Sequence, residues 1–211
     1  MRPITISMAP SATDADGICA SQTPSGASNL TINGVLASGG VATLGAVSAV
    51  TITGGSDESG KTFTVYGTDH YGLAISESIT GPNATTVVST KSYKTITQIA
   101  VSAATTGAIT VGVNGTGISR AIPLDIHNQA GFFVNMGIDV TGTIDLTVQH
   151  TFDDPFTSTF NNYAATWLDH PDLIGVTADQ DGFYEQPVRA VRVVVNSSAS
   201  GSATLTLVQA G

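Results

Sequence analysis

The sequence predicts an all-β protein with two antiparallel domains of the sandwich or barrel type. Apolar residues alternate with small polar residues in many short runs, and Gly, Asn or Asp stands at most of the joins between them. Regular short strands at such spacing are typical of β-sandwiches and barrels. The length of 211 residues suits one large or two small domains, and either division leaves enough apolar sequence to build a core.

The first domain is expected over residues 10–117. Its predicted strands are 30–36, 49–54, 61–67, 73–81, 93–102 and 108–113. The segment GTDHYG, residues 67–72, separates two alternating runs and predicts a hairpin loop. We expect His70, at the tip of this loop, to be a solvated side chain without a function, because polar loop tips commonly carry such residues.

The second domain is expected over residues 118–211. Its predicted strands are 131–142, 143–152, 186–197 and 203–210. Turn-like sequence joins the first strand to the second and the third to the fourth, which predicts two antiparallel hairpins. Between them lies a long, acidic and aromatic connection, residues 153–185, in which only STFNNYAATWL could form a short helix. A connection of this length in a small β domain is usually functional or forms an interface.

The charge balance bears on the class of partner. The chain has 16 acidic against seven basic residues and a formal net charge of -9. Nucleic acids and anionic membranes bind clustered Lys and Arg, so neither is expected as a partner. Residues 121–211 hold ten of the acids and only Arg189 and Arg192 as bases. Metal cations or a basic protein surface are the electrostatically favoured partners.

The cysteine content and the N-terminal sequence bear on where the protein works. Cys19 is the only cysteine, so no intrachain disulfide can form, and we expect its side chain to be buried as a small hydrophobe. The opening MRPITISMAPSATDADG lacks a basic segment followed by an apolar one, and no apolar run approaches the roughly 20 residues that span a bilayer. We therefore expect synthesis in a cytoplasm without export by the usual route.

Two segments have the D-x-D-G spacing of calcium loops, Asp14–Gly17 and Asp179–Gly182. Only the second is followed by a further acid, so Asp179, Asp181 and Glu185 are the candidate cation ligands. Neither segment supplies the full ligand set of an EF-hand loop. Because Asp-Gly is also common turn chemistry, we interpret both segments primarily as turns and predict no metal.

The stretch VQHTFDDPF, residues 148–156, and the following WLDHPD, residues 167–172, concentrate histidine and aspartate. Their candidate metal ligands are His150, Asp153, Asp154, Asp169, His170 and Asp172. Alternation places His150 on the apolar face with Val148, near the end of a strand, and Asp-Asp-Pro is a typical turn that ends such a strand. No HExxH pattern or paired Cys/His spacing is present, so a strand end followed by a turn is favoured over a metal site.

Motifs of catalysis or cofactor binding are missing from the sequence. It contains no G-x-S-x-G elbow, P-loop or helix-opening G-x-G-x-x-G, and its single cysteine has no local signature with histidine. We therefore predict no catalytic residues, no cofactor and no enzymatic activity.

Several tracts resemble a family of small structural proteins of tailed bacteriophages. They are MRPITIS at the start, IPLD at 122–125, VQHTFDDPF, and PVRAVRV with LVQAG near the end. The Thr/Gly-rich stretch 28–112 also resembles a β domain found repeatedly in phage virion proteins. The resemblance implies a virion component made in the bacterial cytoplasm, a head decoration or cement protein or one attached to the tail. It also implies that residues 10–117 are an inserted domain and that strand 3–8 completes the C-terminal domain.

The resemblance further implies that the partner is the major capsid protein or another virion protein, and that the chain forms a homo-oligomer, a trimer at threefold positions. The candidate interface anchors are Phe156, Phe160, Tyr163 and Trp167, with burial in the domain's own core as the alternative. Two other classes stay open. A tail-associated or host-adsorption carbohydrate-binding sandwich would need exposed coplanar aromatics or a cation in the 179–185 loop. A metal-dependent enzyme would need His150 and His170 to converge with carboxylates.

Overall fold

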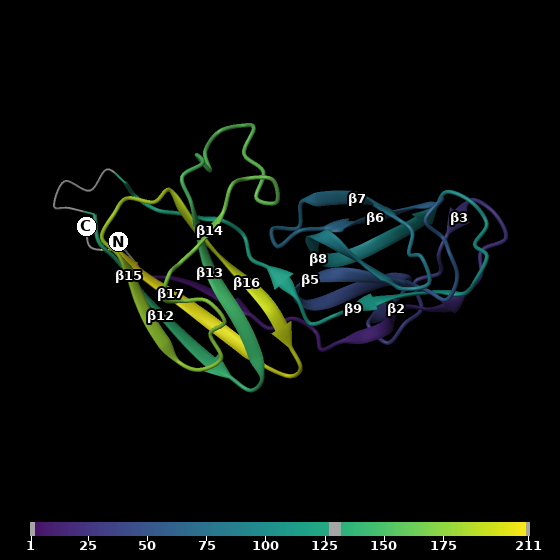
Figure 1. The fold of residues 1–211 in the computed structure, drawn as a ribbon, viewed down its shortest axis with the longest axis horizontal. Helices are drawn as coiled ribbons and strands as arrows, with labels where there is room; N and C mark the ends of the chain where they lie inside the picture. Colours follow the sequence, from purple (N-terminus) through teal and green to yellow (C-terminus); the bar gives the residue numbers. More distant parts are fainter. Residues whose placement is uncertain (1–2, 127–131, 210–211) are drawn as a thin grey trace. The chain divides into compact units, whose positions relative to one another are not determined.

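The computed structural model describes residues 3–126 and 132–209, and these contain strands, turns and loops but no helix (Figure 1). The all-β prediction is confirmed. The chain divides into two compact units. One combines Met1–Ala9 with Gly117–Gly211 and is called the composite unit below; the other, Pro10–Thr116, is called the inserted unit.

The inserted unit is built on one antiparallel sheet with the order β2-β9-β5-β8-β6-β7. Its strands are β2 (Asp14–Gln22), β3 (Ser28–Asn29), β4 (Ala37–Ser38), β5 (Val41–Gly54), β6 (Thr62–Thr68), β7 (Ala74–Thr80), β8 (Thr86–Val101) and β9 (Ile109–Val113). The long strands β5 and β8 change register along their pairing, at bulges that bend a strand. The sheet can therefore enclose a core that includes Tyr93, Phe63 and Leu44, all fully buried.

The hairpin predicted around GTDHYG is present between β6 and β7. Asp69 fixes its loop, because its Oδ1 accepts hydrogen bonds from the backbone N–H groups of Tyr71 and Leu73, at 2.8 and 2.9 Å. Gly72 follows with φ +79°, a conformation that favours glycine. His70 is exposed at the tip.

The strand predicted over residues 30–36 is wrong. Leu30 and Ile32 are buried, so the alternation correctly reports a side facing the core, but the backbone makes no regular ladder there. The side chain of Gln22 bonds both the N–H and the carbonyl of Thr31, and the N–H groups of Asn33 and Gly34 both reach Ile18 O. Apolar alternation indicates burial, and here side chains provide the partners that a neighbouring strand would otherwise supply.

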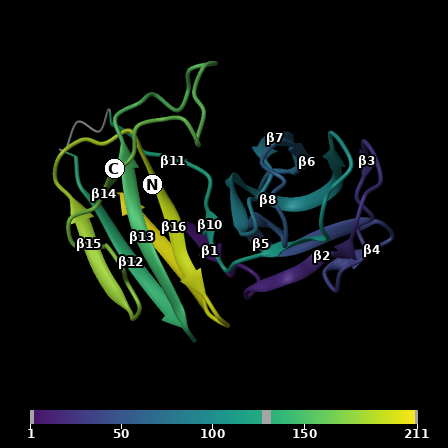
Figure 2. The same cartoon turned by 45° about the vertical axis from the view of Figure 1, so that its right-hand side comes forward.

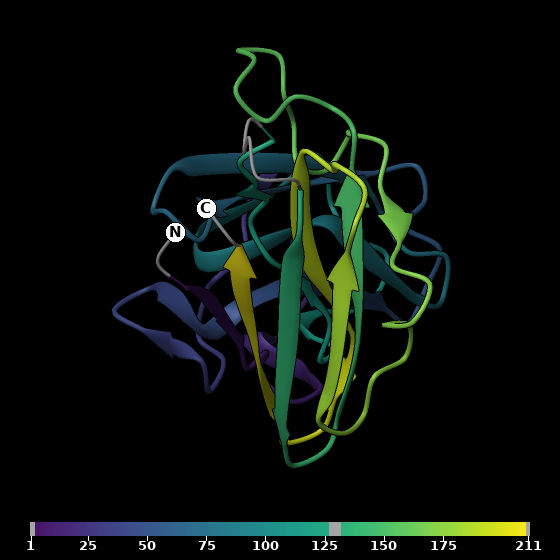
Figure 3. The ribbon, with the colours of Figure 1, turned by 90° about the vertical axis from the view of Figure 1, so that its left-hand side faces the viewer.

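The composite unit has two antiparallel sheets, which Figures 2 and 3 show as two layers. The first has the order β1-β17-β12-β15, and the second β10-β16-β13-β14 with β11 also pairing β16. Their strands are β1 (Ile4–Met8), β10 (Gly117–Ile118), β11 (Ile122–Pro123), β12 (Val134–Thr141), β13 (Ile144–Thr151), β14 (Leu168–Asp169), β15 (Gln180–Tyr184), β16 (Ala190–Ser198) and β17 (Ser202–Gln209).

The N-terminal strand belongs to this unit. β1 pairs antiparallel with β17, from Ile4 opposite Leu207 to Met8 opposite Ala203. Ile6 and Met8 are buried, whereas Thr5 and Ser7 point outward. The prediction that residues 3–8 complete the C-terminal sheet is confirmed.

The two predicted hairpins of the composite unit are wrong. β12 pairs with β17 and β15, and β13 pairs with β16, so each short connection carries the chain from one sheet to the other. The two connections contact each other: Ala199 N–H donates to Thr143 O at 3.1 Å, and a Cβ on Gly201 would lie only 2.6 Å from Thr143. Turn chemistry marked both reversals correctly, but it does not specify whether the next strand stays in the same sheet.

The connection 153–185 contains β14 and β15, and no helix forms at 158–168. One turn is closed there by Asn161 O, which accepts from the N–H groups of Ala164 and Ala165. The next carbonyl, of Asn162, accepts instead from the Trp167 indole and the Arg192 guanidinium. Two side chains therefore bond the carbonyl that would accept a backbone N–H if the helix continued.

Candidate interaction surface of the composite unit

The segment HTFDDPF is a strand end followed by a turn, as predicted. β13 ends at Thr151, whose Oγ1 accepts from the N–H of Asp153 at 3.0 Å. Asp154 then shapes the turn, because its Oδ1 accepts from Phe156 N–H at 3.1 Å and its carbonyl accepts from Thr157. Short polar side chains that bond the backbone two residues on are the ordinary means of fixing such turns.

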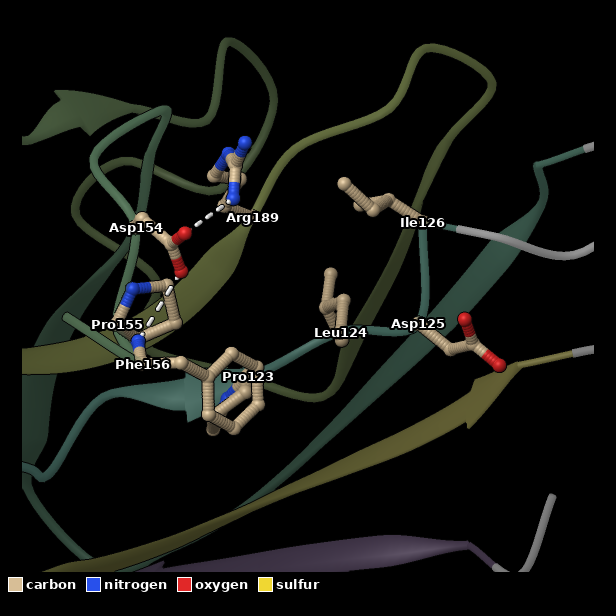
Figure 4. Close-up of a pocket in the computed structure, with 8 residues that line it drawn as sticks. All are labelled: Pro123, Leu124, Asp125, Ile126, Asp154, Pro155, Phe156 and Arg189. Carbon is tan, nitrogen blue, oxygen red and sulfur yellow. Dashed lines mark hydrogen bonds and ion pairs between the residues drawn. The ribbon is translucent and has the colours of Figure 1, made fainter.

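The aspartates of this segment hold the loop in place. Asp153 Oδ2 accepts from Thr166 N–H at 2.7 Å, which ties the beginning of the loop to its end. Asp154 forms an ion pair with Arg189 Nη1 at 2.8 Å (Figure 4). Both carboxylates therefore have partners within the protein, and the loop that projects beyond the sheets in Figure 3 is fixed at its base.

Phe156 is the most exposed aromatic residue of this loop, with 80% of its surface accessible. It borders a groove of about 390 Å³, the Phe156 groove, lined by Pro123, Leu124, Asp125, Ile126, Asp154, Pro155, Phe156 and Arg189. In Figure 4 the Asp125 carboxylate points away from the apolar lining residues. The segment 123–126 that forms the opposite wall is anchored by Gln209, whose Oε1 accepts from Asp125 N–H at 3.0 Å.

The other three interface candidates are partly buried. Trp167 packs on its own unit: the Arg192 guanidinium lies 4.2 Å from its ring centroid, and its indole N–H donates to Asn162 O at 3.0 Å. Arg192 also donates to Gln149 Oε1, and burial lowers the pKa of its guanidinium to about 10. Phe160 and Tyr163 lie in the same loop, half-buried. Phe156 alone among the four combines full side-chain exposure with a neighbouring groove.

His150 and His170 converge on Tyr184. The two imidazole centroids lie 5.2 and 4.8 Å from the Tyr184 ring, both edge-on, and the Tyr184 hydroxyl is 3.0 Å from His150 Nδ1. His170 Nδ1 accepts from Asp172 N–H, so its Nε2 carries the hydrogen donated to Phe183 O. Burial lowers the pKa of His150; nearby His170 acts in the same direction and Asp169 opposes it. Burial also raises the pKa of Tyr184.

Within residues 3–126 and 132–209, no group of three or more His, Cys, Asp or Glu side chains is arranged to hold a metal ion. The candidate ligands are instead used separately, as turn formers, ion-pair partners and ring contacts.

The first D-x-D-G segment lies in β2, and the second runs from Asp179, just before β15, into that strand, so the prediction that they form turns is wrong. Asp14, Asp16 and Gly17 begin β2, where the register against β9 shifts between Asp14 and Cys19. Gly182 lies within β15, opposite Met136, where a Cβ would come within 2.9 Å of Leu173. The glycine is required there for close packing and not for reversal of the chain.

The three acids proposed as cation ligands are spread along β15 and its flanks. All three are exposed, and Asp179 Oδ1 accepts from Val140 N–H at 2.8 Å. A strand separates alternate side chains by more than a turn does, and these carboxylates lack the common centre that a calcium loop provides.

Phe133 and Phe183 are exposed residues that the sequence reading did not single out. Tyr184 faces inward, so alternation along β15 turns Phe183 outward, and Phe133 stands two positions before outward-facing Asn135. The two rings stack, with centroids 5.9 Å apart and planes 20° from parallel. The signal available in the sequence was the adjacent Phe183–Tyr184 pair, because consecutive residues of a strand point to opposite faces and one of the two rings must face outward.

Cys19 is buried in the inserted unit, as expected, and burial raises the pKa of its thiol to about 12. The thiol is therefore un-ionised at neutral pH and a poor nucleophile.

No helix able to cross a membrane occurs among the described residues. Comparisons of the chain with protein-family models and with curated protein sequences give no match.

Proposed function

We propose that this protein is a non-enzymatic structural component of a tailed-phage virion, a capsid decoration protein that binds the head lattice through the Phe156 groove. The observation that carries the proposal is Phe156, an aromatic side chain 80% exposed on a loop that is fixed by Asp153 and by the Asp154–Arg189 pair. The resemblance of the sequence to phage structural proteins supplies the partner.

The energetics suit a docking role. An aromatic anchor held by a preorganised loop loses little conformational entropy when it binds, and covering a Phe side chain contributes about 1.5–3 kcal/mol. The apolar wall formed by Pro123, Leu124 and Ile126 would be covered in the same contact. Aromatic anchors surrounded by a polar rim are the usual centre of protein interfaces.

The protein would act mechanically, by adding binding energy to the assembled lattice. A protein that binds only the assembled lattice lowers the free energy of the assembly by RT ln(1 + [L]/Kd), so heads become harder to dissociate as sites fill. The net charge of -9 favours a basic capsid surface over nucleic acid. A homo-oligomer, a trimer at threefold positions, would multiply the contacts per bound particle.

The experiment is co-sedimentation of the purified protein with heads assembled from the major capsid protein of the phage that carries this sequence. Phe156→Ala should weaken binding about tenfold or more, from the lost aromatic burial. Phe183→Ala is the matched control, because it removes another exposed phenylalanine outside the groove and should bind heads like the original protein.

Wild-type head binding by Phe156→Ala would exclude the groove as the contact. Binding to purified tails but not to heads would favour the tail-associated alternative and overturn the decoration role.

A further inference from the structure

The outer face of the sheet β1-β17-β12-β15 carries a second exposed aromatic site. Phe133, just before β12, is 39% exposed there, and Phe183, on β15, is 50% exposed. The register places Phe183, Asn135 and Val208 in one row across three strands. We call Phe133, Asn135, Phe183 and Val208 the Phe183 face.

Beside this row the sheet surface is open and polar. The next row contains Asp181, Gly137 and Thr206, and a Cβ added at Gly137 would meet no atom within 4 Å. Beyond Thr206 stands Thr5, and the Ser7 and Thr204 hydroxyls bond each other at 2.9 Å. The row with the aromatic rings and the Asn135 amide is thus followed by a strip of small side chains that presents carboxylate and hydroxyl groups.

The charge of this face restricts its ligand. The strands β1, β12, β15 and β17 contain Asp139 and Asp181, both exposed, and neither Lys nor Arg. Anionic ligands would be repelled. A second copy using the same face would bring like charges together without a compensating cation, and the isolated aromatic pair supplies little apolar area for a stable dimer. A neutral ligand rich in hydroxyl groups would not be repelled by the carboxylates and would not need a large apolar area.

We infer that the Phe183 face binds a neutral oligosaccharide. The C–H face of a pyranose ring would pack on the exposed surface of the phenylalanine pair, an apolar contact. The Asn135 amide can donate to one hydroxyl and accept from another, the Asp181 carboxylate accepts, and Thr206 can do either. Gly137 leaves room for the next sugar to lie along the sheet. This inference does not rest on the capsid role.

Saturation-transfer NMR on the full chain tests it, with maltotetraose, cellotetraose and triacetylchitotriose as probes and tetragalacturonic acid as the anionic control. We expect at least one neutral probe to bind at millimolar concentration and the anionic control not to bind. Phe183→Ala and Phe133→Ala should each weaken binding tenfold or more. Phe183→Tyr, which keeps the ring, should retain it, and Phe156→Ala is the control outside the face.

Three results would overturn the inference. One is failure of every neutral probe to bind; another is binding that survives both Phe183→Ala and Phe133→Ala. The third is an oligomer that dissociates on Phe183→Ala in light scattering, which would make the face a protein contact. Head binding measured on the same Phe183→Ala protein stays normal if only the sugar site is lost, so failure of either proposal can be told from failure of the other.

Discussion

The inserted unit and the composite unit place their phenylalanines differently. The one phenylalanine of the inserted unit, Phe63, is fully buried, whereas Phe133, Phe152, Phe156 and Phe183 of the composite unit are all exposed. The inserted unit also buries a carboxylate: Glu58 is inaccessible and binds Lys61 and two backbone N–H groups. The buried Phe63 and Glu58 stabilise the inserted unit, and we propose that the exposed phenylalanines of the composite unit serve binding.

The largest expected effect concerns the strand that ties the N-terminus to the composite unit. Ile6→Asp would place an unpaired carboxylate at a buried position opposite Leu205, at a cost of about 4 kcal/mol. Thr5→Asp puts the same group on the exposed face and is the control. Trp167 is the chain's only tryptophan, so its fluorescence follows unfolding of the composite unit alone.

Hydrogen exchange should show the inserted unit unchanged in Ile6→Asp. Equal loss of protection in both units would break the comparison, because it would make them one cooperative structure.

The second expected effect concerns the buried charge. Glu58 Oε1 accepts from Thr106 and Gly107 N–H, each at 2.8 Å, and Lys61 pairs with Oε2. Glu58→Ala leaves the two backbone N–H groups without this partner and removes the ion pair, and we expect it to destabilise the inserted unit by about 3 kcal/mol in chemical denaturation followed by hydrogen exchange. Glu185→Ala, at an exposed glutamate, should change stability little. Wild-type stability of Glu58→Ala would refute the assigned role.

The smallest effect is a difference in acid sensitivity. Burial and His170 lower the pKa of His150 below 6.5, so the folded composite unit binds fewer protons than its unfolded chain. It should lose stability as the pH falls below 6.5. For Glu58, burial acts to raise the pKa, but the bonds from Lys61, Gly107 and Thr106 prevail and hold it below 4.5. The inserted unit should therefore lose this contribution only as the pH falls below 4.5.

Trp167 fluorescence and hydrogen exchange across this pH range check the order. His150→Gln should abolish the early loss in the composite unit, and Glu58→Gln should flatten the later one. Simultaneous loss in both units near pH 4.5 would contradict the role of His150.

Alternation of apolar residues was enough to predict β6, β7, β12 and β17, because each has one buried face and one more exposed face. It also predicted β13, although Thr147 and Thr151 of that strand are buried together with its apolar residues. It could not predict which sheet receives β13 after the turn at Gly142, since that depends on contact with Gly201, far along the chain. The turn at Asp153–Pro155 was predictable because its bonds are local. The His150–Tyr184 contact joins residues 34 positions apart and had no local signal.

The residues of the candidate surface could likewise be predicted only in part. The sequence pointed to the aromatic loop as a candidate interface, but it could not separate exposed Phe156 from Trp167, which Arg192 covers. Phe183 was overlooked because the same segment was interpreted as a loop, whereas β15 assigns its side chains to alternate faces.

The pairing of β1 with β17 also orders events on the ribosome. β1 leaves the exit tunnel first, yet its partner is synthesised only after the whole of Pro10–Thr116. The inserted unit contains all of its own strands, so we expect it to fold before β17 is available to pair with β1. Proteolysis of ribosome-stalled chains would reveal a protected Pro10–Thr116 fragment with a cleavable leader, and early protection of β1 would show another order of assembly.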